Sequence, residues 1–209
     1  MTQHATRERR TRSDGERTRA AILDAAVKLS TVDGLEGLTI GNLAKSLRMS
    51  KGGLYAHFGS KEELQLATVD AAAAIFTTEV VSPSLSAQPG VRQLLAFCDS
   101  YFDHLERRTF PGGCFFAGAT LEMGTHHGPV QERVARFHTG FIQLIHQYIR
   151  TAVDNHELAE TEDPRALALE LNGVLLAVDT NFVMYDDQTV LELGRRVVRR
   201  RLGVTEGDS

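Results

Sequence analysis

Cysteines are scarce in this chain of 209 residues, which contains only Cys98 and Cys114. Two cysteines do not make a disulfide framework, so we expect a reducing, cytoplasmic location. Long apolar runs are also missing, and none approaches the roughly 20 residues needed to cross a bilayer. The N-terminus is polar and rich in arginine, with no apolar segment behind it, which excludes a secretory signal. We therefore expect no membrane partner.

The strict alternation of apolar and polar residues that is typical of strands is absent. Apolar residues instead recur every three or four positions, which predicts an all-α fold. Helices are predicted over 16–33, 40–47, 51–58, 61–80, 91–108, 115–123, 130–154, 164–185 and 188–202.

Helix start signals support several of these boundaries. Ser60 and Glu63 form the S-x-x-E pattern of a capping box, and Thr189 and Glu192 are predicted to form another. Asp163 followed by Pro164 is typical of an N-cap and first helical residue. The stretch SPSLSAQPG (82–90) is predicted to be a linker.

Charge is distributed unevenly along the chain. Residues 1–65 hold 11 Lys or Arg against 8 Asp or Glu, whereas residues 66–209 hold 12 against 19. The positive N-terminal part could face a polyanion while the acidic remainder stays away from it. Ordinary scatter of surface charge remains the alternative explanation.

The segment 39–64 predicts two short helices joined by a tight turn. Thr39 and Ser50 are suited to cap the two helices, and Leu54 and Phe58 form an inward-facing pair. This arrangement is the helix-turn-helix pattern, in which the first residues of the second helix reach the major groove. Each polar residue taken singly has an ordinary structural explanation, but the combination favours DNA binding.

The candidate DNA-binding residues are those expected to face outward or to offer groups to phosphate. Two adjacent glycines leave no side chain between helix and DNA, so the backbone can approach closely. Hydroxyl, imidazole and ammonium groups can contact phosphates, which set affinity and register rather than sequence preference. The set is Thr39, Arg48, Ser50, Lys51, Gly52, Gly53, Tyr55, His57 and Lys61.

Residues 17–64 resemble the DNA-binding domain of the TetR family of bacterial transcriptional regulators. The most specific block is S-K-G-G-L-Y-A-H-F-G-S-K-E-E-L (50–64). The resemblance implies a homodimer with an N-terminal helix-turn-helix and a C-terminal helical domain. It also implies that a ligand captured in the C-terminal domain changes the spacing of the two DNA-binding heads. The positions that it assigns to DNA contact are Thr39, Ser50, Lys51, Gly52, Tyr55, His57 and Lys61.

One position departs from the family pattern. Gly53 stands where family members often carry a side chain that touches a base. Recognition of bases is therefore expected to depend more on Lys51, Arg48 and the Arg7–Arg12 arm. Residues 1–15 are predicted to be a flexible basic arm, which could reach a minor groove or be disordered without DNA. The predicted domains are this arm, a DNA-binding domain over 16–62, and a ligand-binding and dimerisation domain over 63–209.

The C-terminal part is expected to hold a ligand pocket among its helices. Aromatic residues at helical spacing are candidates for the pocket, although core packing is the more ordinary role for each. Glu122 could pair with a cationic ligand if it points into the pocket, since an unpaired buried carboxylate is costly. The candidate ligand-binding residues are Phe97, Tyr101, Cys114, Phe115, Phe116, Glu122, Phe137, Phe141 and Phe182.

Two further residue types bear on chemistry. Cys114 follows Pro-Gly-Gly at a predicted helix start, where free N–H groups could lower the thiol pKa and make it reactive. A small buried residue is the simpler interpretation. His126 and His127 are adjacent rather than four apart, so no metal site is predicted. No cofactor is predicted.

Three functions remain open at this point. The first is a homodimeric repressor that binds a palindromic operator, is released by a small molecule and dimerises through helices 164–185 and 188–202. The second is a helical enzyme or small-molecule carrier, for which the sequence offers no P-loop, G-x-S-x-G or H-E-x-x-H motif. The third is a redox or electrophile sensor based on Cys114. We favour the repressor and expect no enzyme activity.

Overall fold

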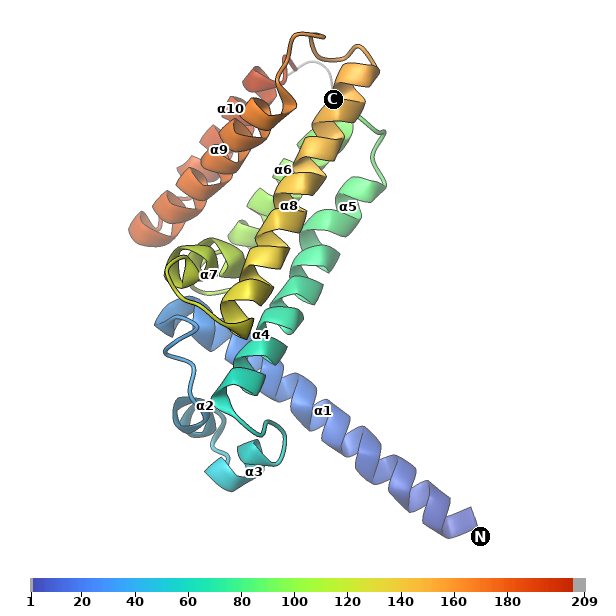
Figure 1. The fold of residues 1–209 in the computed structure, drawn as a ribbon, viewed down its shortest axis with the longest axis vertical. Helices are drawn as coiled ribbons and strands as arrows, with labels where there is room; N and C mark the ends of the chain where they lie inside the picture. The colour runs from blue at the N-terminus through green and yellow to red at the C-terminus, as the bar shows by residue number, and fades with distance from the viewer. Residues whose placement is uncertain (1, 205–209) are drawn as a thin grey trace.

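The computed structural model describes the backbone of residues 2–204 and the side chains of residues 15–204. Every regular element in that range is helical (Figure 1), which confirms the predicted all-α class. In chain order the elements are α1 (Thr2–Asp33), α2 (Ile40–Leu47), α3 (Lys51–Tyr55), α4 (Lys61–Phe76), the π-turn η1 (Thr77–Val81), α5 (Ser82–Leu85), α6 (Val91–Glu106), α7 (Phe115–Met123), α8 (Pro129–Asp154), α9 (Pro164–Tyr185) and α10 (Thr189–Arg201).

The N-terminal unit, which we call the head, consists of α2, α3 and the C-terminal half of α1. It lies at one end of the elongated molecule (Figure 1). Its hub is formed by Leu43, Leu54 and Phe58, none of which is exposed. The Arg19 guanidinium lies 4.2 Å from the centre of the Phe58 ring and closes the hub from the α1 side.

Helix α1 begins at Thr2, well before the predicted start at Glu16. The segment predicted to be a flexible arm is therefore helical along its backbone, and it projects away from the rest of the molecule (Figure 1). Arg, Glu, Gln and Ala are good helix formers, so a helix nucleated in the packed half can continue without an apolar stripe. The predicted minor-groove contact of Arg7–Arg12 concerns side chains outside the described ones.

Helix α4 connects the head to the C-terminal part, which we call the body. It packs against α1 at one end and against α8 further along. The chain does not leave the helix at residue 82 as predicted, because it continues through the π-turn and then α5 to Leu85. The π-turn places Glu79 beside α6, where its carboxylate lies 2.7 Å from His104 Nδ1 and accepts a hydrogen bond from Thr109 Oγ1 at 2.8 Å.

The body is built from α4 and the helices α6 to α10. Helix α8 packs against α4, α6, α7 and α9, and α10 packs against α6 and α9 (Figure 1). Arg195 fastens α10 to α6 by hydrogen bonds to Asp99 at 3.0 Å and to Asp103 at 2.7 Å. The first turn of α10 differs from the predicted capping box, because the carboxylate of Asp187, not the hydroxyl of Thr189, accepts the first hydrogen bonds.

Two helical segments are long and apolar enough to cross a membrane by length and composition, namely Lys61–Leu85 and Pro164–Tyr185. The expectation that no segment approaches that length was therefore too strict. Core helices of soluble proteins satisfy the same criterion. Both segments are packed elements of this body, since α4 lies against α8 and α9 lies against α8 and α10.

Candidate DNA-binding surface and effector cavity

The turn between α2 and α3 is built by local hydrogen bonds. Thr39 Oγ1 accepts from the Asn42 amide at 3.1 Å, and Ser50 Oγ accepts from the Gly53 amide at 3.0 Å, as the sequence predicts for N-caps. Arg48 ends α2 with a left-handed backbone at φ 54°. This residue turns the chain within three positions, so that α3 starts next to the beginning of α2.

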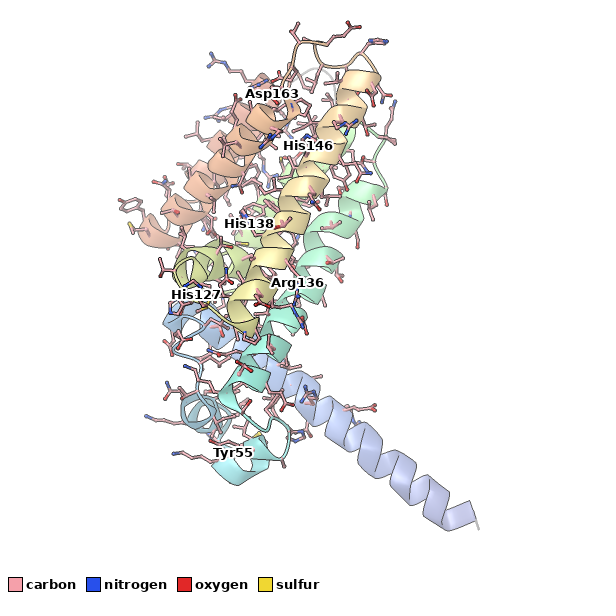
Figure 2. The ribbon with its side chains drawn as sticks, in the orientation of Figure 1. Tyr55, His127, Arg136, His138, His146 and Asp163 are labelled. Atoms are coloured by element: carbon pink, nitrogen blue, oxygen red, sulfur yellow. The ribbon has the colours of Figure 1, made fainter. Side chains whose placement is uncertain are left out.

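The outer face of α3 is open to an approaching helix or duplex. Tyr55 is 54% exposed and lies at the far end of the molecule from α9 (Figure 2). Lys51 is exposed, and its Nζ lies 3.7 Å from where a Cβ of Gly41 would stand, over the start of α2. A Cβ added at Gly52 would meet no heavy atom within 4 Å. Neither internal space nor backbone conformation requires glycine there, and its effect is to keep this face bare.

The predicted phosphate-binding residues His57 and Lys61 make hydrogen bonds within the protein, His57 through its backbone carbonyl and Lys61 through its side chain. The backbone carbonyl of His57 accepts a hydrogen bond from Arg19 at 2.5 Å. The Lys61 ammonium donates to the backbone carbonyl of Glu36 and to its carboxylate, both at 2.8 Å. The hydrogen bond from Lys61 lowers the pKa of Glu36. Lys61 therefore lies at the edge of the surface with its charge already paired.

The body contains a cavity enclosed by α4, α6, α7, α8 and α9. The centre of a water molecule can occupy about 60 Å³ of it. His138 lies on the part of α8 that faces α7 and α9 (Figure 2). The wall is formed by Phe76, Tyr101, Cys114, Phe116, Ala117, Thr120, Leu121, Phe137, His138, Phe141, Asn172, Leu175 and Leu176.

Five of the predicted ligand-binding residues line this cavity. Sequence reasoning missed Phe76, Thr120, His138 and Asn172, which come from four different helices. No spacing along the chain links these positions, so only the packing of the helices brings them together. The predicted residues on the wall are Tyr101, Cys114, Phe116, Phe137 and Phe141.

Three other predicted aromatics are buried but lie off the cavity wall. Phe97 packs against Tyr148 with ring centres 6.2 Å apart, and Phe115 packs against Phe110 at 6.4 Å. Phe182 lies under the Arg108 guanidinium, at 4.7 Å from the ring centre. Helical periodicity identified these residues as inward-facing, but the inward side of each helix is wider than the cavity.

Glu122 does not face the cavity, which corrects its predicted pairing with a cationic ligand. Its carboxylate accepts a hydrogen bond from the Leu35 amide at 2.7 Å and another from the Glu36 amide at 2.8 Å. Both amides belong to the turn between α1 and α2. Leu121 and Glu122 are neighbours on α7. This helix therefore forms part of the cavity wall and is also hydrogen-bonded, through Glu122, to the α1–α2 turn of the head.

The structure also argues against a reactive Cys114. The thiol is buried, and burial together with the nearby Asp179 carboxylate raises its pKa to about 11. A thiolate is the reactive species, so a thiol with a raised pKa is poorly suited to sensing electrophiles. The Cys114 amide donates to Asp179 at 2.9 Å, and burial raises the pKa of Asp179 to about 6.

Known proteins match both parts of the chain. The family described as tetracyclin repressor-like, C-terminal domain, matches residues 90–198, and the one described as bacterial regulatory proteins, tetR family, matches residues 22–68. The HTH-type transcriptional regulator SrpR of Pseudomonas putida is 26% identical over 151 residues, which cover 72% of this chain and 68% of SrpR.

Solved structures resemble the whole fold. A TetR transcriptional regulator from Chloroflexus aurantiacus has a TM-score of 0.83 and 25% identity, covering 91% of this chain and 96% of its own. The structure of AibR has a TM-score of 0.69 and 22% identity, covering 87% of this chain and 97% of AibR, and shows likeness of fold alone. With both halves matched and more than half of the chain covered by the C-terminal match, the chain belongs to the TetR family of bacterial regulatory proteins, and it is a ligand-responsive, DNA-binding transcriptional regulator.

Proposed function

We propose that this protein is a cytoplasmic homodimeric repressor that leaves a palindromic operator when a small molecule enters the body cavity. The observation that carries the proposal is the double role of α7. Thr120 and Leu121 line the cavity, and Glu122 accepts hydrogen bonds from the two amides at the α1–α2 turn. A ligand that shifts α7 therefore acts directly on the position of the head.

The route continues from the turn toward the DNA-binding surface. The Glu36 amide donates a hydrogen bond to the Glu122 carboxylate. The Lys61 ammonium donates to the carbonyl and to the carboxylate of Glu36. Gln65 on α4 donates to the Leu35 carbonyl at 2.7 Å, so α4 holds the same turn from its other side. A displacement of α7 relative to α4 changes the orientation of the turn, of α2 that follows it, and of the Lys61 ammonium. The ligand drives this change only by binding one orientation more tightly than the other.

The proposed dimer uses the outer faces of α9 and α10. Several large apolar side chains are exposed there, which is unusual for a surface that stays in water. Two copies packed through these helices would form a four-helix interface and place two heads on one side of a duplex. Half-sites about 34 Å apart, or a multiple of that, match such a symmetric arrangement. The exposed apolar residues are Leu169, Val183, Met184, Tyr185, Leu193 and Val197.

A protein of the same fold supports the pairing of effector and operator. AibR has been crystallised in complex with isovaleryl coenzyme A and operator DNA. We take from it only that this fold can hold a small molecule together with DNA. The residues of the present cavity decide which molecule enters here.

The first experiment identifies the operator. Random DNA fragments selected by the purified protein are sequenced, and a palindrome is expected. A Leu193→Glu variant, which places a charge in the proposed dimer face, should sediment as a monomer and lose at least tenfold in affinity for that palindrome. A variant that still sediments as a dimer would place the interface elsewhere.

The coupling route is tested with Glu122→Ala and with Glu132→Ala as its control, since Glu132 is an exposed carboxylate on α8. We expect Glu122→Ala to weaken operator binding by about fivefold or more, the usual scale of a coupling between sites. Fluorescence anisotropy on the selected duplex measures the dissociation constant. Equal affinities for Glu122→Ala and Glu132→Ala would reject α7 as the connection.

A further inference from the structure

We propose that the effector is an uncharged molecule of about one aromatic ring with a single hydrogen-bonding substituent such as a hydroxyl group. This inference rests on the proposed function, because it names the chemical class of the molecule that the body cavity accepts. It is carried by the charge, the shape and one unpaired oxygen atom of the cavity wall.

The wall carries no Asp, Glu, Lys or Arg side chain. An ion that leaves water for such a site loses its hydration without gaining a counter-charge, which is strongly unfavourable. The Asp179 carboxylate is not part of the wall, and its Oδ1 already accepts the Cys114 amide. His138, Asn172, Thr120 and the Tyr101 hydroxyl supply the polar side-chain groups of the wall. A neutral ligand is therefore favoured over an anion or a cation.

The apolar part of the wall contains four phenylalanine rings. Phe116 and Phe137 are stacked with their ring centres 3.3 Å apart and their planes within 9° of parallel. Phe76 presents an edge-on contact to Phe116, Phe137 and Phe141, at centre distances of 6.2, 5.3 and 5.9 Å. No guest ring fits between the stacked pair, but an aromatic guest beside these rings can make offset or edge-on contacts that an aliphatic chain of the same size cannot make. The volume of about 60 Å³ that the centre of a water molecule can occupy suits one ring rather than several.

The polar feature is Thr120 Oγ1. This atom is buried, and it has no hydrogen-bond partner among the residues that the structure describes. A threonine hydroxyl within a helix often bonds to the carbonyl four residues earlier, as Thr68 and Thr151 do here. An unpaired buried hydroxyl is costly, and a ligand hydroxyl that bonds to it recovers that cost. Thr120 thus selects for one hydrogen-bonding group on an otherwise apolar ring.

The test uses four probes of one ring each: benzyl alcohol, toluene, benzoate and benzylamine. Isothermal titration measures their affinity for the full chain and for two variants, Thr120→Val and the matched control Thr151→Val. Valine has nearly the shape of threonine but lacks the hydroxyl. Thr151 is on α8, away from the cavity wall, and its hydroxyl is bonded to the Gln147 carbonyl.

We expect benzyl alcohol to bind the unmodified protein in the millimolar range or tighter and about fivefold more tightly than toluene, the scale of one neutral hydrogen bond. Thr120→Val should remove that preference, whereas Thr151→Val should keep it. Benzoate and benzylamine should bind at least a hundredfold more weakly. The ligand class is rejected if neither neutral probe binds, if a charged probe binds as tightly as benzyl alcohol, or if Thr120→Val leaves the preference intact.

Release of DNA is measured separately, by anisotropy of the selected duplex with added benzyl alcohol. Binding of benzyl alcohol without release from the operator contradicts the proposed function and leaves the ligand class standing. Binding of a charged probe with release from the operator contradicts the ligand class and leaves the proposed function standing. The two proposals therefore fail in different experiments.

Discussion

The head helices α2 and α3 and the connecting helix α4 begin at side-chain caps, whereas most of the other body helices begin without one. Thr39, Ser50 and Ser60 each accept a hydrogen bond from an amide in the first turn of α2, α3 and α4. The helices α6, α7 and α8 begin at residues that provide no such bond. Local hydrogen bonds thus set where the head helices begin, whereas the packing of large side chains sets the arrangement of most body helices. A change to one side chain should therefore have different consequences in the two regions.

The largest effect is expected where body packing is densest. Phe76 is buried and makes ring contacts with Tyr101, Phe116, Phe137, Phe141 and His104. Phe76→Ala should lower the free energy of unfolding by about 3–5 kcal/mol, because it removes a buried ring and leaves a cavity. Urea denaturation followed by near-ultraviolet circular dichroism measures the loss.

Tyr55→Ala is the matched change in the head. The ring is half exposed, so its removal should alter the free energy of unfolding by no more than about 0.5 kcal/mol. Operator affinity should fall in this variant even though stability is kept. A large loss of stability from Tyr55→Ala would erase the contrast between head and body.

The next effect depends on pH and also belongs to the body. Burial raises the pKa of Asp179 to about 6, above its ordinary value of 3.8. A raised folded-state pKa means that the favourable contribution is complete below about pH 4 and is lost as the pH rises through 6. Asp179→Asn should therefore be more stable than the unmodified protein at pH 7.5, by up to about 3 kcal/mol, with a smaller difference at pH 4.5.

Urea unfolding at the two pH values measures this difference. Asp154→Asn, which changes an exposed aspartate on α8, controls for the loss of one charge. A pH-independent difference between Asp179→Asn and the unmodified protein would show that the buried carboxylate does not titrate as inferred.

A smaller effect is expected at the DNA-binding surface. Lys51→Ala should weaken operator binding by roughly tenfold at low salt, since one charge-assisted hydrogen bond is lost. The slope of log affinity against log salt should become shallower by about 0.9, the change for one phosphate contact. Lys28→Ala is the control, because Lys28 is paired with Asp24 on α1. Identical slopes for the two variants would remove Lys51 from the DNA surface.

The smallest effect concerns a cap. Ser50→Ala removes the acceptor for the Gly53 amide and should cost about 1 kcal/mol of stability. Ser86→Ala is its control, since Ser86 is exposed at the end of α5. The thermal midpoints of both variants measure the difference. A Ser50→Ala midpoint equal to that of Ser86→Ala would mean that packing, rather than its cap, positions α3.

The same difference between the regions decides what could be predicted from the sequence. The starts of α2, α3 and α9 were predicted well because a cap and the amide that it binds are two or three residues apart. The first turn of α10 was assigned wrongly because Thr189 donates its amide and its hydroxyl to the Asp187 carboxylate instead of accepting a hydrogen bond as a cap. The start of a helix can be predicted from the sequence when only one nearby side chain can cap it.

The cavity could be predicted only in part. Tyr101, Phe116 and Phe137 were recognised as inward-facing, but which inward residues share a cavity depends on how the helices pack. Glu122 shows the limit most clearly, since its partners Leu35 and Glu36 lie 87 and 86 positions away in the chain. Nothing near Glu122 in the sequence indicates that its carboxylate accepts hydrogen bonds from the α1–α2 turn.

The pairing of Lys61 with Glu36 has a consequence for binding itself. Two of the three Lys61 ammonium donors are bonded to Glu36. A phosphate that also replaces the Glu36 carboxylate makes an exchange of surface partners worth about 0–1 kcal/mol. That exchange removes one hydrogen bond from the α1–α2 turn, which is also hydrogen-bonded to Glu122 of the body. In the proposed mechanism, operator and effector act on one short turn from opposite ends. Coupling between two binding sites is reciprocal. If the effector lowers the affinity for the operator by some factor, the operator lowers the affinity for the effector by the same factor.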